Sequence, residues 1–216
     1  MTSRLRISSI NEKLLNQNVT LNGWVRTRRG SKGISFIQLY DGSNQNGIQA
    51  VADEVLGNYE EISKLTTGAS VSISGKVVES PAKGQAFEIH AEEVRVIGAS
   101  SGDLYPLQKK GHTLEFLREI AHLRPRTNTL GAVFRLRNTL SWAIHSFFQE
   151  RDFLYVQTPI ITANDAEGAG EMFHVTALDL ENLPKNSEGK VDYSKDFFGT
   201  DVSLTVSGQL GSEVFA

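Results

Sequence analysis

The sequence contains no cysteine, so it can form neither disulfide bonds nor thiolate metal sites. It also contains no run that approaches the roughly 18 apolar residues expected of a membrane-spanning helix. The N-terminal segment MTSRLRISSINEK has no apolar h-region, which argues against a secretory signal. We therefore expect a cytoplasmic protein that has no membrane partner.

A strong excess of charge of one sign is also absent. The 216 residues carry a net charge of −3, which argues against a general nucleic-acid coat protein. Their length suits one or two globular domains. Residues 1–98 hold 11 Lys and Arg against 10 Asp and Glu, whereas residues 99–216 hold 11 against 15. The densest basic group, RTRRGSK, could still bind a polyanion locally. Its cations are Arg26, Arg28, Arg29 and Lys32.

The first part of the chain is predicted to consist mainly of short strands. Apolar and polar residues alternate in NVTLNGWVRTRR, as they do in a half-buried strand. The expected strands cover residues 18–29, 34–42, 46–53, 70–80 and 85–98. Helical spacing replaces the alternation at 54–67. Three strands, a helix and two strands is the order of an oligonucleotide-binding (OB) barrel, and a small five-stranded barrel that binds nothing is the alternative.

The second part of the chain mixes helices and strands. The polar segment 99–111 lacks periodicity and indicates a linker between domains. Helices are expected at 112–123 and 131–152. Strands are expected at 153–162, 172–178 and 202–210. The predicted domains are a barrel (1–98), a linker with a short helix (99–130) and a second domain (131–216).

Several motifs appear in a fixed order along the chain. GWVRTRR and FIQLYDG lie in the barrel, LRPRTN precedes the long helix, and TPII, EGAGEMF and SGQL follow it. Each motif alone is weak, but the ordered set resembles the class II aminoacyl-tRNA synthetases of the aspartyl/asparaginyl/lysyl subgroup over essentially the whole chain. The resemblance implies an aminoacyl-tRNA ligase with an α+β fold, in which an all-β OB barrel precedes the first part of an antiparallel-sheet catalytic core.

In that family the barrel binds the tRNA anticodon. An aromatic residue on the second strand stacks on the central uridine, while an Arg on the first strand and a Gln on the third read its edge. The matching positions are Phe36, Arg28 and Gln49. Uridine offers two carbonyl acceptors and one N–H donor, which suit an Arg and a Gln amide. Phe36 is otherwise a core aromatic, and Trp24 is either a core residue or a second stacking platform.

The motif EGAGEMF places two glutamates among small residues after an apolar run. Gly168 and Gly170 would let the backbone approach a ligand closely. In the family, a glutamate of this loop receives the α-ammonium of the amino-acid substrate, and Glu167 matches it. Gln209 in SGQL matches a glutamine that also contacts the substrate, and Glu171 is either a helper or a loop residue.

The long helix and the strand that follows it resemble motif 1, which builds the homodimer interface of the family. That strand contains Pro159, and proline is tolerated at a sheet edge or an interface but not in the middle of a sheet. We therefore expect a homodimer with Pro159 at its interface. An ordinary buried helix–strand pair is the alternative.

Two features favour asparagine over aspartate as the substrate. Aspartyl members carry a lysine shortly after QL that pairs with the substrate carboxylate, whereas here Ser212 stands at that position and Glu213 follows. A carboxamide NH₂ needs an acceptor, so Glu213 suits asparagine and repels aspartate. The long insertion at 179–201 is typical of asparaginyl members. The resemblance therefore implies L-asparagine and tRNA(Asn) as partners, with an aspartyl relative as the alternative.

The reaction implied by the resemblance needs ATP and Mg²⁺. The amino acid attacks the α-phosphate of ATP and is then transferred to tRNA, and the family neutralises the phosphate charge from motifs 2 and 3. These motifs follow the SGQL segment in the family and are not in this sequence. We therefore assign no catalytic or metal-binding residues, expect no tight cofactor binding, and expect the 216-residue chain to be inactive alone.

Two other functions stay open at this point. One is a non-catalytic RNA-binding paralogue that uses the barrel alone. The other is an amidotransfer or asparagine-synthesising relative, although relatives of that kind lack the barrel that this chain is predicted to have.

Overall fold

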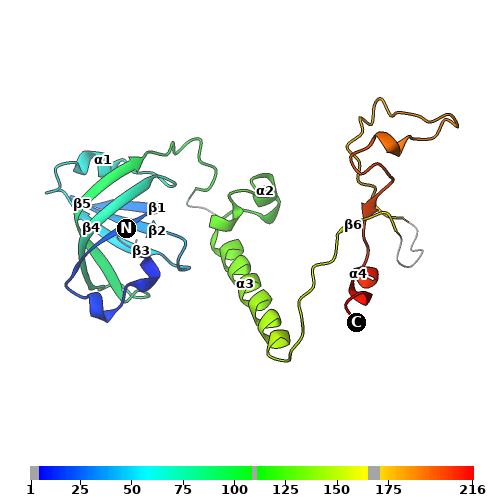
Figure 1. Cartoon of the computed structure of the whole chain (residues 1–216). Helices are drawn as coiled ribbons and strands as arrows, with labels where there is room; N and C mark the ends of the chain where they lie inside the picture. Colours follow the sequence, from blue (N-terminus) through cyan, green and yellow to red (C-terminus); the bar gives the residue numbers. More distant parts are fainter. Residues whose placement is uncertain (1–4, 109–110, 165–170) are drawn as a thin grey trace. The chain divides into compact units, whose positions relative to one another are not determined.

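The computed structural model describes residues 5–108, 111–164 and 171–216. These residues form two compact units, residues 1–140 and residues 141–216. The first contains the barrel and most of the following helical segment, and the second contains short strands and loops (Figure 1).

Five strands close the barrel of the first unit in the order β1-β2-β3-β5-β4 (Figure 1). All neighbouring pairs are antiparallel except β3 and β5, which are parallel. This topology confirms the expected OB barrel. The strands are β1 (Asn18–Ser31), β2 (Ile34–Tyr40), β3 (Ile48–Asp53), β4 (Ser70–Glu79) and β5 (Phe87–Gly98).

Alternate residues of each strand fill the barrel interior, as the period of two requires. The largest of these side chains are completely buried: Leu21, Ile37, Leu39, Ile73 and Ile89. Between β3 and β4, the short helix α1 (Tyr59–Ser63) adds the fully buried Ile62 to the same core. This helix is shorter than the helical pattern at 54–67 predicts, because only one turn packs against the barrel.

A β-bulge in β1 changes which residues face outward. The register of β1 against β2 shifts between Val25 and Thr27. A bulge places one extra residue on one strand, so the alternation is inverted beyond it. Arg28 consequently pairs with the buried Ile37, and Arg29 pairs with Phe36. The sequence alternation that puts Val19, Leu21, Gly23 and Val25 inside cannot be extended past this point.

The helical segment of the first unit begins with α2 (Leu114–Glu119), a 3₁₀ turn (Arg124–Arg126) and the start of α3 (Asn128–Gln149). Helix α3 begins three residues earlier than the sequence pattern predicts, because the hydroxyl of Thr127 accepts from the backbone N–H of Leu130. Side chains join this segment to the barrel: Gln45 Nε2 donates to the Asn128 carbonyl at 2.7 Å, and Arg135 donates to the Asn44 carbonyl at 3.0 Å.

The second unit contains less strand than the sequence predicts. Its two-stranded sheet consists only of β6 (Ile161–Thr162) and β7 (Ser203–Leu204), with one further bridge between His174 and Ser203. The expected strand at 153–162 is wrong over 153–160, because the described part of the chain supplies no neighbour for it there. The expected strand at 202–210 is wrong at its end, where Gln209–Glu213 form the helical turn α4.

Within the described residues, no helix is both long and apolar enough to cross a membrane. Helix α3 has the required length but too few strongly apolar residues.

Candidate nucleic-acid interface and amino-acid site

Phe36 and Gln49 lie on one outer face of the barrel. Ser35, Ile37 and Leu39 of β2 are buried in the interior, so Phe36 points outward and is half-buried. In the β2–β3 register Phe36 pairs with Val51, and Gln38 pairs with Gln49. Phe36 and Gln49 are therefore diagonal neighbours on the same face, within reach of one ligand. This is the arrangement that stacking on a base and reading of its edge require.

Arg28 does not share that face. Its partner across the ladder is the buried Ile37, and its Nε atom is buried without a hydrogen-bond partner. Its guanidinium extends along the strand over Gly30, where an added Cβ would be only 2.9 Å from Arg28 Nη1. The exposed Arg29 is the basic residue directly opposite Phe36. The bulge in β1 is the reason that Arg28 and Phe36 lie on different faces of the sheet.

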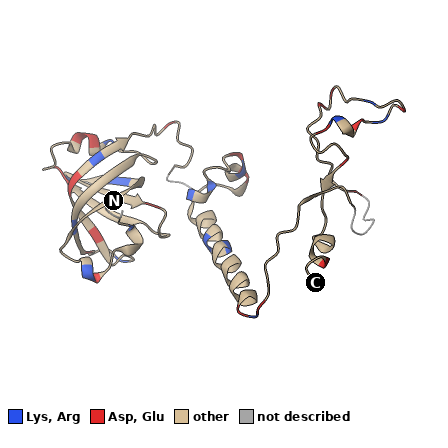
Figure 2. Cartoon of the chain, viewed as in Figure 1, with Lys and Arg blue, Asp and Glu red and all other residues tan. Residues whose placement is uncertain are grey.

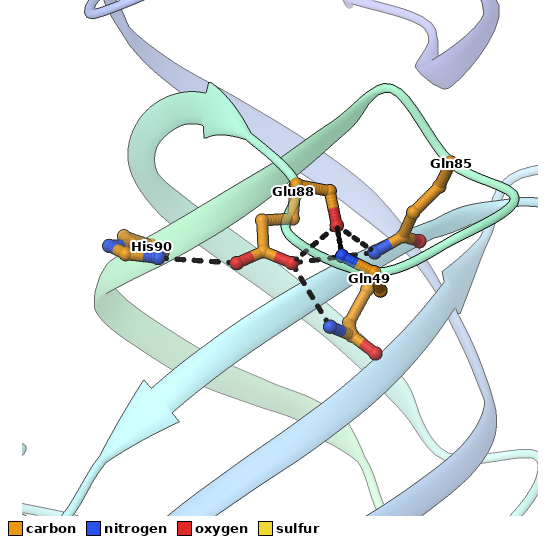
Figure 3. A network of polar contacts seen from close by, with 6 residues as sticks. Gln49, Gln85, Glu88 and His90 are labelled. Atoms are coloured by element: carbon orange, nitrogen blue, oxygen red, sulfur yellow. Dashed lines mark hydrogen bonds and ion pairs between the residues drawn. The ribbon is translucent and has the colours of Figure 1, made fainter.

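A polar cluster that sequence reasoning missed supports Gln49. Glu88 on β5 lies opposite Gln49 in the parallel β3–β5 register. Gln49 Nε2 donates to Glu88 Oε2 at 3.1 Å, and Ser80 Oγ donates to the same oxygen at 2.9 Å (Figure 3). Gln85 Nε2 lies 3.4 Å from Oε2, and His90 Nε2 lies 3.3 Å from the other oxygen, Oε1. No sequence signal marks Glu88, since its burial depends on the 80–86 loop that carries Ser80 and Gln85.

The basic residues of RTRRGSK contact different parts of the molecule. Arg26 Nη2 donates to the Arg126 carbonyl at 2.9 Å, and its guanidinium lies 4.7 Å from the centre of the Tyr40 ring. The Arg126 guanidinium lies 5.1 Å from the Trp24 ring centre. Trp24 is 40% exposed, so it is not a core residue. Trp24 and Arg26 therefore join the barrel to the helical segment of the same unit, and the cluster is not one continuous patch. Figure 2 likewise shows basic and acidic residues interspersed along the ribbon of the barrel.

The predicted amino-acid site is only partly within the described residues. Glu167 lies outside them, and Glu171 is exposed. Gln209 and Glu213 come together on the helical turn α4, where Gln209 Nε2 donates to Glu213 Oε1 at 3.1 Å. Both are exposed and four residues apart, the spacing that brings side chains together on a helix.

Two family models match consecutive parts of this chain. Residues 19–97 match the OB-fold nucleic acid binding domain of the anticodon-binding type. Residues 113–210 match the tRNA synthetases class II (D, K and N). Residues 113–210 thus belong to this class II tRNA synthetase family, and the barrel before them matches the anticodon-binding type.

Curated relatives of this synthetase family match nearly the whole chain. An asparagine–tRNA ligase of Desulfitobacterium hafniense is 58% identical over 201 residues, which are 93% of this chain and 43% of the relative. An asparagine–tRNA ligase of Cytophaga hutchinsonii is 54% identical over 216 residues, or 99% of this chain and 47% of the relative. The chain thus spans less than half the length of these relatives.

A solved structure has the same fold. The asparaginyl-tRNA synthetase of Pyrococcus horikoshii, complexed with asparaginyl-adenylate, matches with a TM-score of 0.79 and 23% identity. The match covers 100% of this chain and 46% of that one. The class II synthetase fold, with an N-terminal barrel and the start of the catalytic core, is therefore the fold of this chain.

Aspartate side chains within the insertion at 179–201 accept hydrogen bonds that stabilise its conformation. Thr176 Oγ1 donates to Asp196 Oδ2, and the Ala177 N–H donates to Asp196 Oδ1 at 2.9 Å. The Thr176 hydroxyl and then the Ala177 N–H lower the pKa of Asp196, because they stabilise its charged form. The Ser194 hydroxyl lowers the pKa of Asp192 in the same way. The insertion is therefore an ordered segment and not a simple linker.

The end of helix α3 and the segment after it expose many apolar side chains. Residues 139–149 contain no Lys, Arg, Asp or Glu, and Figure 2 shows the corresponding part of α3 without charged residues. Trp142, Ile144 and Phe147 are exposed there, followed by Phe153 and Leu154. Pro159 is also exposed. A row of large exposed apolar residues is typical of a surface that another protein segment covers.

Metal binding finds no support among the residues that the structure describes. No group of three or more His, Asp or Glu side chains among them could hold a metal ion.

Proposed function

We propose that the chain belongs to an asparagine–tRNA ligase and supplies its anticodon-reading barrel and part of its asparagine site. The observation that carries this proposal is the outward Phe36 beside Gln49 on a closed OB barrel. The complete enzyme activates L-asparagine with ATP and Mg²⁺ and transfers it to tRNA(Asn) in the cytoplasm. The identity of 54–58% to asparagine–tRNA ligases supports this function.

Within the proposed function, the barrel reads the central anticodon uridine. The Phe36 ring supplies a stacking surface, and the Gln49 amide reads the edge of the stacked base. Arg28 stays in the proposal as a donor to a uridine carbonyl, and this contact would require its side chain to turn from the side of Ile37 toward the face of Phe36. Arg29 lies on the face of Phe36 and is placed to contact the RNA backbone.

Asparagine binding is assigned to Glu167, Gln209 and Glu213, with Glu171 nearby in sequence. Glu167 would receive the α-ammonium of the substrate. The contact between Gln209 and Glu213 supports a shared site, because it orients an acceptor-only carboxylate beside an amide. Glu213 would accept from the asparagine carboxamide and repel the carboxylate of aspartate.

The exposed apolar surface of α3 is assigned to a homodimer interface. Its uncharged end and the neighbouring exposed Pro159 support contact with a second copy. A large apolar area of this kind is typical of an obligate interface.

Replacement of Phe36 by Ala tests the RNA-reading part of the proposal. The ring is outward and half-buried, so its loss removes a stacking surface while the barrel core stays intact. We expect affinity for a hairpin RNA with the tRNA(Asn) anticodon in its loop to fall roughly tenfold, since stacking contributes about 1–3 kcal/mol per base. Fluorescence anisotropy at one fixed salt concentration measures this.

The matched control is Val55→Ala, which removes an exposed apolar side chain outside the barrel strands. It should bind the hairpin RNA as the unchanged chain does. Equal affinity of Phe36→Ala and the unchanged chain, with both folded, would show that the ring does not stack on RNA.

Replacement of Glu213 tests the asparagine part. In a complete enzyme that carries these residues, Glu213→Ala should lower kcat/KM for asparagine in ATP–pyrophosphate exchange by at least about tenfold, because the carboxamide loses its acceptor. Glu213→Gln retains an acceptor but loses the negative charge, so it should tolerate aspartate better than the unchanged enzyme does.

Glu181→Ala, at an exposed carboxylate of the insertion, is the control and should leave the exchange rate unchanged. Unchanged asparagine kinetics in Glu213→Ala would remove Glu213 from the specificity argument.

A further inference from the structure

The sequence contains two Asn-Gly pairs, Asn22–Gly23 and Asn46–Gly47. Asparagine is one of the thermolabile residues, because the backbone nitrogen of the next residue can attack its side-chain carbonyl carbon. A glycine in the next position favours this attack, since it has no side chain to hinder the approach. The structure places the two pairs in different surroundings, so they should react at different rates.

The pair Asn22–Gly23 lies within strand β1, which is paired on both sides. Gly23 pairs with Val71 of β4, and a Cβ added at Gly23 would lie 2.6 Å from the Tyr40 carbonyl oxygen of β2. The backbone at this pair can change its conformation only if the strand first leaves the barrel, which requires local unfolding. We therefore expect Asn22 to be protected from the reaction.

The pair Asn46–Gly47 lies between β2 and β3, outside the strands. Asn46 is exposed, and its side chain makes no hydrogen bond among the described residues. Only its carbonyl is engaged, since it accepts from Gln38 Nε2 at 2.7 Å. The Asn46 side chain can thus rotate toward the Gly47 nitrogen without breaking a contact.

The fold requires a glycine at position 47. Gly47 has a φ of 72°, in the left-handed region, and an added Cβ would lie 2.2 Å from the Leu39 carbonyl oxygen. Any other residue would be strained there and would clash with the backbone of β2. The residue type that most favours the reaction is therefore fixed by the turn between β2 and β3.

The side chain of Asn44 holds the atom that would attack. The Gly47 N–H donates to Asn44 Oδ1 at 2.7 Å, a local contact typical of asparagine before a turn glycine. The nitrogen must lose this proton before it can attack Asn46. Because a hydrogen bond to the protonated form stabilises that form, the contact with Asn44 should slow the reaction.

We propose that Asn46 is a site of spontaneous deamidation and that Asn44 slows the reaction there. The Gly47 nitrogen loses its proton to solvent and bonds to Asn46 Cγ. The Cγ–Nδ2 bond then breaks, and the amide nitrogen leaves as ammonia after it takes up a proton from solvent. Water adds to either carbonyl of the resulting succinimide and opens it to aspartate or isoaspartate.

The product differs from asparagine in charge and, in one form, in length. Both forms add a negative charge, and isoaspartate also adds one methylene to the main chain. The modified bond lies beside the joint between the barrel and the helical segment, where Arg26 Nη1 donates to the Gln45 carbonyl at 3.2 Å and Arg135 Nη2 donates to the Asn44 carbonyl at 3.0 Å. This inference does not depend on the proposed reading of RNA.

The test incubates the full chain at mildly alkaline pH and follows deamidation of each pair by mass spectrometry of its peptides. Asn46 should convert at least about tenfold faster than Asn22 in the folded chain, because only Asn22 needs local unfolding. In concentrated urea the two pairs should convert at similar rates. Equal rates in the folded chain, or no conversion of Asn46 while the urea sample converts, would overturn the assignment of the site.

Variants of Asn44 test its part. Asn44→Ala should speed conversion of Asn46 roughly fivefold, about the effect of one lost hydrogen bond. Asn44→Asp is the matched control, because its carboxylate still accepts from the Gly47 N–H, and it should not speed the conversion. An unchanged rate in Asn44→Ala, or an equal rise in both variants, contradicts the role of the hydrogen bond.

Hydrogen exchange gives a second readout that does not involve the reaction. The backbone N–H of Gly47 should exchange slowly in the unchanged chain and in Asn44→Asp, and faster in Asn44→Ala, since only the last lacks the acceptor. Thermal unfolding of each variant shows that the barrel is intact. Fast exchange of this N–H in the unchanged chain would show that Asn44 does not hold it.

Discussion

Ile37→Ala is expected to lower the free energy of unfolding of the barrel by about 2–5 kcal/mol, the usual cost of truncating a buried Ile. Ile37 is completely buried and lies between Phe36 and Gln38, both of which face outward. Its neighbours across the sheet are Arg28 and the fully buried Ala50. The small Ala50 side chain cannot fill the space that a missing isoleucine would leave, so a cavity should remain in the core.

Urea unfolding followed by circular dichroism measures this loss. Phe36→Ala, one residue away, is the informative comparison, because it should lower RNA affinity while changing stability much less. If Ile37→Ala unfolds at the same urea concentration as the unchanged chain, the assigned barrel interior is wrong.

Gly75→Ala is expected to destabilise the barrel by about 3 kcal/mol, within the range for overpacking against a backbone that cannot move away. A Cβ at Gly75 would lie 2.1 Å from the His90 carbonyl oxygen and 2.8 Å from the Ala91 Cα. Both are backbone atoms of the paired strand β5. The β4–β5 register also shifts between Ser74 and Gly75, which leaves Glu92 of β5 as an extra residue, so the glycine lies opposite a bulge where the two backbones come close.

Gly57→Ala is the matched control, since nothing lies within 4 Å of an added Cβ there and its φ is not positive. It should leave stability unchanged or slightly higher, because alanine has less freedom in the unfolded chain. Similar melting temperatures for Gly75→Ala and Gly57→Ala would contradict the close approach of β4 to β5.

The barrel could be predicted from the sequence because its pattern is local. Alternating residues such as Leu21, Ile37 and Ile73 fix the strands and their inner faces, and the order of elements selects the OB topology. The outward position of Phe36 was implied by the family resemblance, and the burial of β2 agrees with it.

The face occupied by Arg28 could not be predicted in this way. One extra residue between Val25 and Thr27 moves every later side chain of β1 to the opposite face of the sheet. No residue type in that segment predicts the bulge. The contact of Gln49 with Glu88 was equally hidden, because it joins strands 39 residues apart through a parallel pairing.

The strands of the second unit were overpredicted for a different reason. Apolar runs such as FLYVQTPIIT satisfy the sequence criteria for a strand, but a strand forms only beside a hydrogen-bonding neighbour. Among the described residues of this unit, Ile161–Thr162 and Ser203–Leu204 pair as strands, and two isolated bridges join His174 to Ser203 and Lys185 to Val191. The predicted ammonium acceptor Glu167 lies outside the described residues, so its role stays a prediction.

The pairing of β3 with β5 has a consequence for how the barrel responds to its ligand. It is the parallel seam that closes the cylinder, and its register runs over only three residue pairs, from Gln49–Glu88 to Val51–His90. Gln49 is thus one of the groups that keep this seam shut. If β3 and β5 separate transiently, the Gln49 side-chain amide loses its orientation before the other strands separate. A bound nucleotide would stabilise this pairing, so it should slow backbone hydrogen exchange first at residues 49–51.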